Sequence, residues 1–152
     1  MSKTQALLKF FAALLLTPSF NITAIAQEPY VYNSNAGKIN YMLQCQGCHK
    51  ASGEGVEGSI PDMSVHGINM LSSERGRQFF VAVPGSSQSP LSDQHLADVL
   101  NYISIDLLES AKNNRGVSLF DTLEVAKYRG IKMKDVAKER AQIISDIERL
   151  AD

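Results

Sequence analysis

The only two cysteines of this sequence stand three positions apart, and a histidine directly follows the second one. The segment is Cys45-Gln46-Gly47-Cys48-His49, a Cys-x-x-Cys-His pattern of the kind that attaches a c-type haem. Two thiols separated by two residues can reach the two vinyl groups on one edge of a porphyrin. The imidazole of the next residue can then ligate the iron. The motif therefore predicts one covalently attached haem c.

Two other uses of a Cys-x-x-Cys pair are a redox disulfide and one half of a zinc site. A structural zinc site normally needs four ligands, and the sequence has no second cysteine pair. His66 and His95 could only complete an improvised site. A thioredoxin-like motif is expected near a strand–helix–strand pattern, which this sequence does not contain. Haem attachment is therefore the interpretation that the motif favours.

The first residues have the pattern of a secretory signal. Lys3 and Lys9 supply positive charge, and residues 10–16 form an apolar run that is too short to span a bilayer. Ala24-Ile25-Ala26 matches an A-x-A cleavage site, which predicts a signal peptide over residues 1–26. The alternative, an uncleaved membrane anchor, is disfavoured by the shortness of the apolar run. We expect a periplasmic or otherwise exported protein with no integral membrane segment in the mature chain.

The charge of the mature chain is mildly acidic and unevenly placed. Without the two lysines of the signal, 13 basic residues stand against 16 acidic ones, a net charge of −3. Residues 27–111 carry −5 and residues 112–152 carry +2. Such a body disfavours nucleic acid as a partner and suits docking to a basic patch on a redox protein.

Helical periodicity dominates the sequence around the motif and predicts an all-α fold. A helix is expected over about residues 35–44, with Ile39, Met42 and Leu43 on one face and the motif at its C-terminal end. Residues 50–69 contain four glycines and one proline, so we expect a loop there. A second helix is expected from Ser73 to Val83. Pro84-Gly85 would end it, and a polar loop over residues 86–90 would follow.

The clearest helical signal covers residues 92–111. Ser92 is the expected N-cap, and an apolar stripe at helical spacing predicts the core face: Leu96, Val99, Leu100, Ile103 and Leu107. After a polar break at residues 112–116, two further helices are expected, over about residues 122–129 and 133–151. The last helix has an apolar face made of Val136, Ile143, Ile144, Ile147 and Leu150. We therefore expect the C-terminal tail to pack on the body or on a partner.

With the motif and its flanking helices placed, residues 35–105 resemble the class I c-type cytochromes. The resemblance rests on "GKINYMLQCQGCH", on the glycine-rich "SGEGVEGSIPD" and on "PLSDQHLADVLNYI". It implies a helical shell around a single haem. Cys45 and Cys48 would form the thioether bonds, and His49 would be the proximal iron ligand. The resemblance predicts a haem domain over residues 27–111 and a helical C-terminal extension over residues 112–152.

The sequence departs from this family on the distal side of the iron. The family usually has a methionine, often as Met-Pro, in the loop before the last helix, where this chain has "VPGSSQSPLSD" with Ser89 before Pro90. No methionine occurs between residues 71 and 132. The candidates for the sixth ligand are Met70, then Met63, then His66. An empty or water-bound position is the remaining alternative, while His95, Met42 and Met133 are expected to have structural or surface roles.

The function that these patterns favour is electron transfer without catalysis. The protein would accept a single electron from a periplasmic dehydrogenase or a membrane complex and pass it to an oxidase or another cytochrome. One alternative is a haem enzyme or small-ligand sensor with an open distal iron, with Arg75, Arg77 and His66 as possible distal residues. Another is the haem subunit of a larger periplasmic dehydrogenase, docked through the C-terminal extension.

Overall fold

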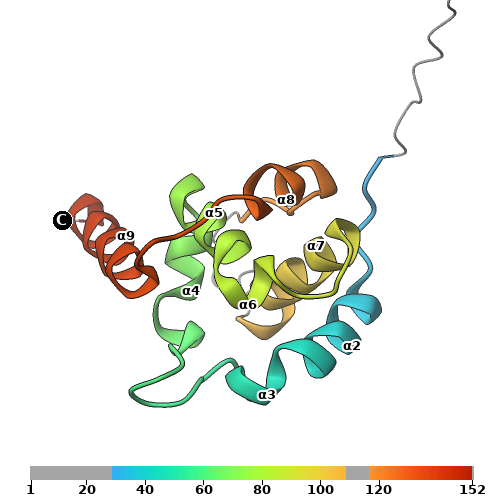
Figure 1. The fold of residues 1–152 in the computed structure, drawn as a ribbon, viewed down its shortest axis with the longest axis horizontal. Helices are drawn as coiled ribbons and strands as arrows, with labels where there is room; N and C mark the ends of the chain where they lie inside the picture. Colours follow the sequence, from blue (N-terminus) through green and yellow to red (C-terminus); the bar gives the residue numbers. More distant parts are fainter. Residues whose placement is uncertain (1–28, 109–116, 152) are drawn as a thin grey trace, which may run out of the picture.

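The computed structural model describes residues 29–108 and 117–151, and these two ranges contain helices and connecting segments but no β-strand. The elements are α2 (Ser34–Gln44), α3 (Gln46–His49), α4 (Met63–Leu71), α5 (Glu74–Ala82), α6 (Pro84–Ser87), α7 (Asp93–Tyr102), the π-helical turn η1 (Ile103–Leu107), α8 (Thr122–Arg129) and α9 (Val136–Ala151). This architecture, drawn in Figure 1, confirms the predicted all-α fold class. The predicted signal peptide lies outside the described residues.

Helix α2 packs most extensively on α7, and a glycine makes the close approach possible. A Cβ atom at Gly37 would collide with the backbone carbonyl oxygen of Asp98 and lie 2.9 Å from the Cβ of Tyr102. One turn later, Tyr41 is only 1% exposed, and its ring lies 5.6 Å from that of Tyr102, centroid to centroid. The contact between the two helices is therefore made by Gly37 and Tyr41, which lie four residues apart on one face.

This geometry corrects the expectation that Met42 packs in the core. Met42 is 53% exposed, and Ile39 and Leu43 are exposed with it. Because Gly37 and Tyr41 set the face that α2 turns toward α7, the other apolar side chains of the helix are left on its surface.

Helix α7 supplies the centre of the core, as its sequence predicts. Ser92 caps the helix by accepting a hydrogen bond from the backbone N–H of His95. Leu96, Val99, Leu100 and Ile103 are all buried, and Leu107 is partly buried against the same cluster. The last turn is a π-helix, in which the N–H of Leu108 donates to the carbonyl of Ile103, 2.9 Å away. Residues 109–111 of the predicted helix lie outside the described residues.

Two polar residues of α7 are buried and anchor segments from both directions along the chain. Asn101 is 0% exposed; its amide donates to the carbonyl of Phe120 and to the hydroxyl of Tyr30, and its oxygen accepts the N–H of Phe120. Asp98 accepts hydrogen bonds from the hydroxyl of Tyr30 and the N–H of Asn33. The irregular lead before α2 and the segment before α8 are thus held on adjacent turns of the central helix.

Helix α4 occupies a region for which a loop was predicted, and that prediction is wrong. Asp62 caps the helix through the N–H of Ser64, and Ile68 and Leu71 face the core. The glycine within the helix has a packing reason: a Cβ at Gly67 would lie 2.7 Å from a methyl carbon of Leu108. A glycine that suggested a loop from the sequence is therefore required by a helix–helix contact.

Helix α5 begins and ends as predicted. Ser73 caps it through the N–H of Gly76, and the helix ends before Val83, the residue that precedes Pro84. The following residues are not simply a loop, because Pro84 begins the single helical turn α6. Proline suits this first position, where its missing N–H is not needed.

The C-terminal helices pack on the body of the same chain, which agrees with one of the two outcomes expected for the tail. Phe120, Val125 and Tyr128 around α8 and Ile143 on α9 are buried in the common core. Helix α8 has the predicted bounds, whereas α9 begins at Val136 and not at Met133, because Asp135 caps it through the N–H of Lys138. Leu150, predicted on the apolar face, is instead 89% exposed.

Two arginines of α5 hold these C-terminal helices in place. Arg75 pairs with Glu139 and Asp146 of α9, at 2.8 Å each. Arg77 pairs with Glu124 of α8, lies over the ring of Phe120 at 3.8 Å from its centroid, and donates to the carbonyl of Ser118. In the described ranges, no helix combines the length and apolar character needed to cross a bilayer.

Candidate haem site

The two cysteines and the histidine of the motif share one helical turn. Cys45 stands between α2 and α3, and its carbonyl accepts hydrogen bonds from the N–H groups of Cys48 (3.1 Å) and His49 (2.9 Å). Residues three and four positions apart are neighbours on a helix surface. The turn therefore presents both thiols and the imidazole on one side.

The two thiols are free but not equivalent. Neither cysteine is in a disulfide; Cys48 is exposed, whereas Cys45 is partly buried against the core. Burial raises the pKa of Cys45 to about 11, and the nearby Cys48 adds to this increase. Cys45 is therefore a protonated thiol at neutral pH. A Cβ at Gly47, between them, would meet no atom within 4 Å, so the outer side of the turn is open.

The imidazole of His49 is held as a neutral ligand. Its Nδ1 is the one buried side-chain nitrogen or oxygen in the described ranges without a hydrogen-bond partner. Burial lowers the pKa of His49, and the carbonyl of Pro61, close to the ring but outside hydrogen-bond geometry at Nδ1, raises it by less. A neutral imidazole is the form that binds a metal.

A folded loop brings Pro61 back to His49. Gly55 has a φ of 70°, and a Cβ there would collide with the carbonyl oxygen of Ile60 and lie 2.7 Å from that of Pro61. A β-bridge pairs Val56 with Ile60. Only glycine combines this left-handed backbone with so close an approach, so Gly55 is what allows the loop to close.

Tyr41 and Lys50 fix the exit of the chain from the motif. Lys50 has φ 54° and ψ −179°, a backbone conformation that side-chain-bearing residues rarely adopt. The hydroxyl of Tyr41 donates to the carbonyl of Lys50 at 2.7 Å. The buried tyrosine that joins α2 to α7 thus also holds the turn after His49.

The candidates for a sixth ligand lie on or near α4. Met70 is 2% exposed within the core, and Met63 is partly buried, its methyl group 3.5 Å from the place of a Cβ at Gly53. His66 lies on the same helix. His95 is exposed in the first turn of α7, as predicted.

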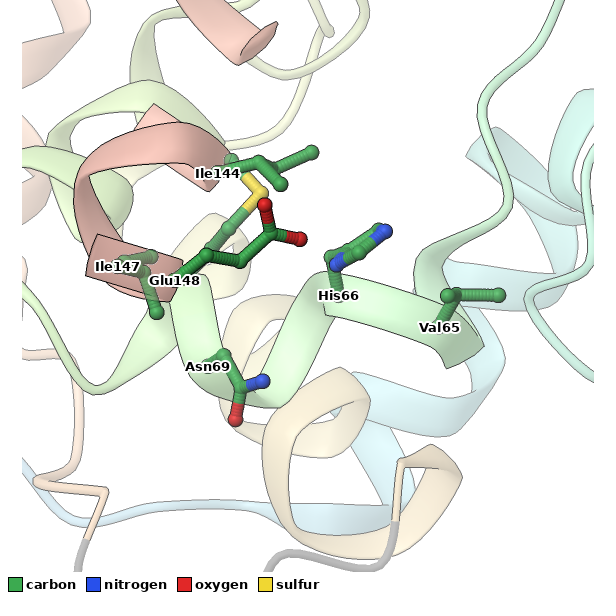
Figure 2. A pocket seen from close by; sticks show the side chains of 7 residues that line it. Val65, His66, Asn69, Ile144, Ile147 and Glu148 are labelled. Atoms are coloured by element: carbon green, nitrogen blue, oxygen red, sulfur yellow. The ribbon is translucent and has the colours of Figure 1, made fainter. Parts of the chain in front are cut away.

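A pocket of about 200 Å³ lies between α4 and α9. Figure 2 shows His66 and Asn69 of α4 with Ile144, Ile147 and Glu148 of α9 around it. Met70 completes its lining. Two of the three sequence-based candidates, Met70 and His66, therefore line the same pocket beside the C-terminal helix.

The segment between α5 and α7, where the resemblance led us to expect a methionine, is held by an arginine of α8. Arg129 donates to the carbonyls of Ser87 (3.1 Å) and Ser89 (2.7 Å) and pairs with Asp93 at 2.7 Å. The hydroxyl of Ser89 donates to the carbonyl of Ser86. The polar groups of this segment thus have partners within the chain.

Sequence reasoning did not identify Pro61, Tyr41 or Arg129 as parts of this arrangement. Pro61 could have been suspected, because a proline that closes a glycine-rich loop after a ligand histidine can only offer a carbonyl. Nothing in the local sequence indicates that Arg129 reaches back 40 positions to Ser89.

Comparison with curated proteins identifies the family. The chain is 30% identical over 120 residues to "Cytochrome c-552" of Thermus thermophilus, an alignment that covers 66% of this chain and 91% of that protein. The chain belongs to the c-type cytochromes. A second "Cytochrome c-552", from another record of Thermus thermophilus, is also 30% identical over 120 residues, which is 80% of its length. No model of a protein family matches this cytochrome, and no solved structure does.

Proposed function

We propose that this c-type cytochrome carries single electrons through one haem c that is bound covalently by Cys45 and Cys48, with His49 as the proximal iron ligand. The observation that supports this most directly is the single helical turn that presents two free thiols and a neutral imidazole together. This donor set fits haem better than zinc, since the described residues contain no cluster of three or more His, Cys, Asp or Glu side chains.

Each residue of the turn has a separate task in this proposal. The sulfur atoms of Cys45 and Cys48 add across the two vinyl groups and fix one edge of the porphyrin. His49 directs a neutral nitrogen at the iron. The haem supplies the one-electron change between ferric and ferrous iron. The surrounding protein sets the potential through burial and through groups that act on His49, such as the carbonyl of Pro61.

The arginines that a haem enzyme could have used are engaged elsewhere. Arg75 and Arg77 are both committed to ion pairs with the C-terminal helices. A catalytic distal arginine would have to be free to reach a molecule bound at the iron. This arrangement supports an electron-transfer protein over an enzyme.

The packing of residues 117–151 on the body also bears on the third hypothesis, a subunit docked through its tail. The apolar residues of α8 and α9 that could have met a partner are buried in the chain's own core. We therefore propose that residues 27–111 and the extension over residues 112–152 form one functional unit. Its partners would be redox proteins such as a periplasmic dehydrogenase, an oxidase or another cytochrome.

The sequence pattern of residues 1–26 supports export, and the proposed site of action is the periplasm or another compartment outside the cytoplasm. A mildly acidic mature chain suits association with a basic surface of the redox partner. Raising the ionic strength is then expected to slow electron exchange with such a partner, because exposed charges are screened.

The decisive experiment tests covalent haem and electron transfer separately. The mature protein, produced with haem-attachment machinery, should keep its haem on a denaturing gel and be reduced and reoxidised by one electron per chain. Cys45→Ser together with Cys48→Ser should abolish the stained band, whereas Ser104→Ala, a buried polar control, should keep it. A wild-type protein that folds but never retains haem would refute the proposal.

A further inference from the structure

The axial position of the iron opposite His49 needs a donor, and the sequence offers few. The chain has three histidines and five methionines. Apart from His49 and Met1, which begins the predicted signal, the donors are two histidines and four methionines: His66, His95, Met42, Met63, Met70 and Met133. Each of them lies in the described part of the chain, so each can be placed.

Met70 and His66 face the C-terminal helix. Both line the pocket between α4 and α9, with Ile144 of α9 on its other wall (Figure 2). In Figure 1, α4 stands between α9 and the turn α3 that carries His49. A side chain that packs toward α9 lies on the face of α4 turned away from that turn.

Met63 is committed to the loop that follows His49. Its N–H donates to the carbonyl of Gly53, and its methyl group packs against Gly53 beside the side chain of Leu107. That loop also brings Pro61 to the ring of His49. Met63 is therefore part of the wall on the proximal side, the wrong side for the opposite axial position.

The other three donors are equally ill placed. Met42 is 53% exposed on α2, the helix that leads into the motif, and His95 is exposed on α7. Met133 lies in the connection between α8 and α9 and packs against the core. The segment Pro84–Leu91 contains neither histidine nor methionine. Its Ser87 and Ser89 hydroxyls donate to backbone carbonyls.

We propose that no side chain of this cytochrome fills the axial position opposite His49, so that this position takes water or a small exogenous ligand. Ferrous iron would accept neutral diatomic molecules such as carbon monoxide or nitric oxide, and ferric iron would accept water or small anions such as cyanide. Each binds by donating a lone pair, and water leaves as the other ligand enters. This inference rests on the proposed haem attachment and adds a ligand-responsive iron to it.

The test uses the full mature holoprotein. The ferric absorption spectrum at neutral pH should be high-spin, and cyanide should convert it to low-spin. Carbon monoxide should shift the Soret band of the ferrous protein with no denaturant present. A low-spin protein whose spectrum carbon monoxide leaves unchanged would overturn the inference. Absence of covalent haem on a denaturing gel would instead mark the failure of the proposed function itself.

Three variants make the result specific to the placement of the donors. Met63→Leu, Met70→Leu and His66→Gln keep the approximate shape of each side chain and should all leave the ferric spin state and carbon monoxide binding unchanged. Far-ultraviolet circular dichroism checks that each variant is folded. If one of them converts a low-spin wild type to high-spin, that residue is the sixth ligand and the inference is wrong.

Discussion

The turn that carries the haem motif and the C-terminal region over residues 117–151 differ in how completely their polar groups are satisfied. The motif has two free thiols, one buried ring nitrogen without a partner and an unfavourable backbone conformation at Lys50. The C-terminal region instead ties its arginine and carboxylate groups into pairs with the body. The difference indicates that the body and extension are complete as a protein scaffold, whereas the motif is completed only by the group it binds.

The largest effect in the scaffold is expected at Asn101. Asn101→Leu would leave the N–H and carbonyl of Phe120 and the hydroxyl of Tyr30 without their buried partners. Each such loss costs about 1–3 kcal/mol, so we expect roughly 3–5 kcal/mol of destabilisation. Urea unfolding measures it. Ser104→Ala, which removes one hydroxyl that donates within α7, is the buried control and should cost under about 1.5 kcal/mol. Equal losses in the two variants would contradict the role given to Asn101.

A smaller loss is expected at Arg129. Its guanidinium is 20% exposed and joins α8 to two carbonyls and one carboxylate of the segment before α7. Arg129→Ala should lower the free energy of unfolding by about 2 kcal/mol. Arg149→Ala is the matched control, because Arg149 is 73% exposed and should contribute less than about 0.5 kcal/mol. If the two variants unfold alike, the segment before α7 is not held by Arg129.

In the motif region, a substitution is expected to stabilise the protein. Lys50→Gly should relieve the positive-φ backbone after His49 and raise the free energy of unfolding by about 1 kcal/mol. Lys50→Ala keeps a Cβ and should not, although both variants remove the same exposed ion pair with Glu54. Thermal unfolding of the two variants decides the matter. An alanine variant as stable as the glycine variant would show that the backbone is not strained there.

The smallest effect appears only at alkaline pH. Burial raises the pKa of Tyr41 to about 12, whereas the unfolded chain ionises it near its ordinary value of 10.0. Above pH 10 the unfolded state releases this proton first, so stability falls as the pH rises from 10 toward 12 and is unaffected below 10. Tyr41→Phe should show a shallower decline in that window. Parallel curves for wild type and variant across pH 10–12 would contradict it.

Local signals predicted the helix ends well. Ser73 and Ser92 cap the helices that their sequences indicate, and α8 has the predicted bounds. These features depend on neighbouring residues alone, which is why they can be found in a sequence. The motif itself belongs to the same class, because one helical turn brings its three side chains together.

The features that were missed depend on contacts between distant segments. Gly67 suggested a loop, yet its role is to let Leu108 approach α4. Ile39 and Met42 formed a plausible core face, yet Gly37 and Tyr41 decide which side of α2 meets α7. The hold of Arg129 on Ser87 and Ser89 has no local trace. Helical periodicity identifies an apolar face but not its neighbour.

The π-helical turn η1 has a consequence for how this chain can change over evolution. A π turn amounts to one extra residue within an α-helix, and removing a residue from Ile103–Leu107 would rotate Leu108 about the helix axis by about 100°. Leu108 would then leave Gly67, and the position of that glycine would be free to carry a larger side chain. The inserted residue and the glycine, about 40 positions apart, are therefore expected to be gained or lost together in descendants of this sequence.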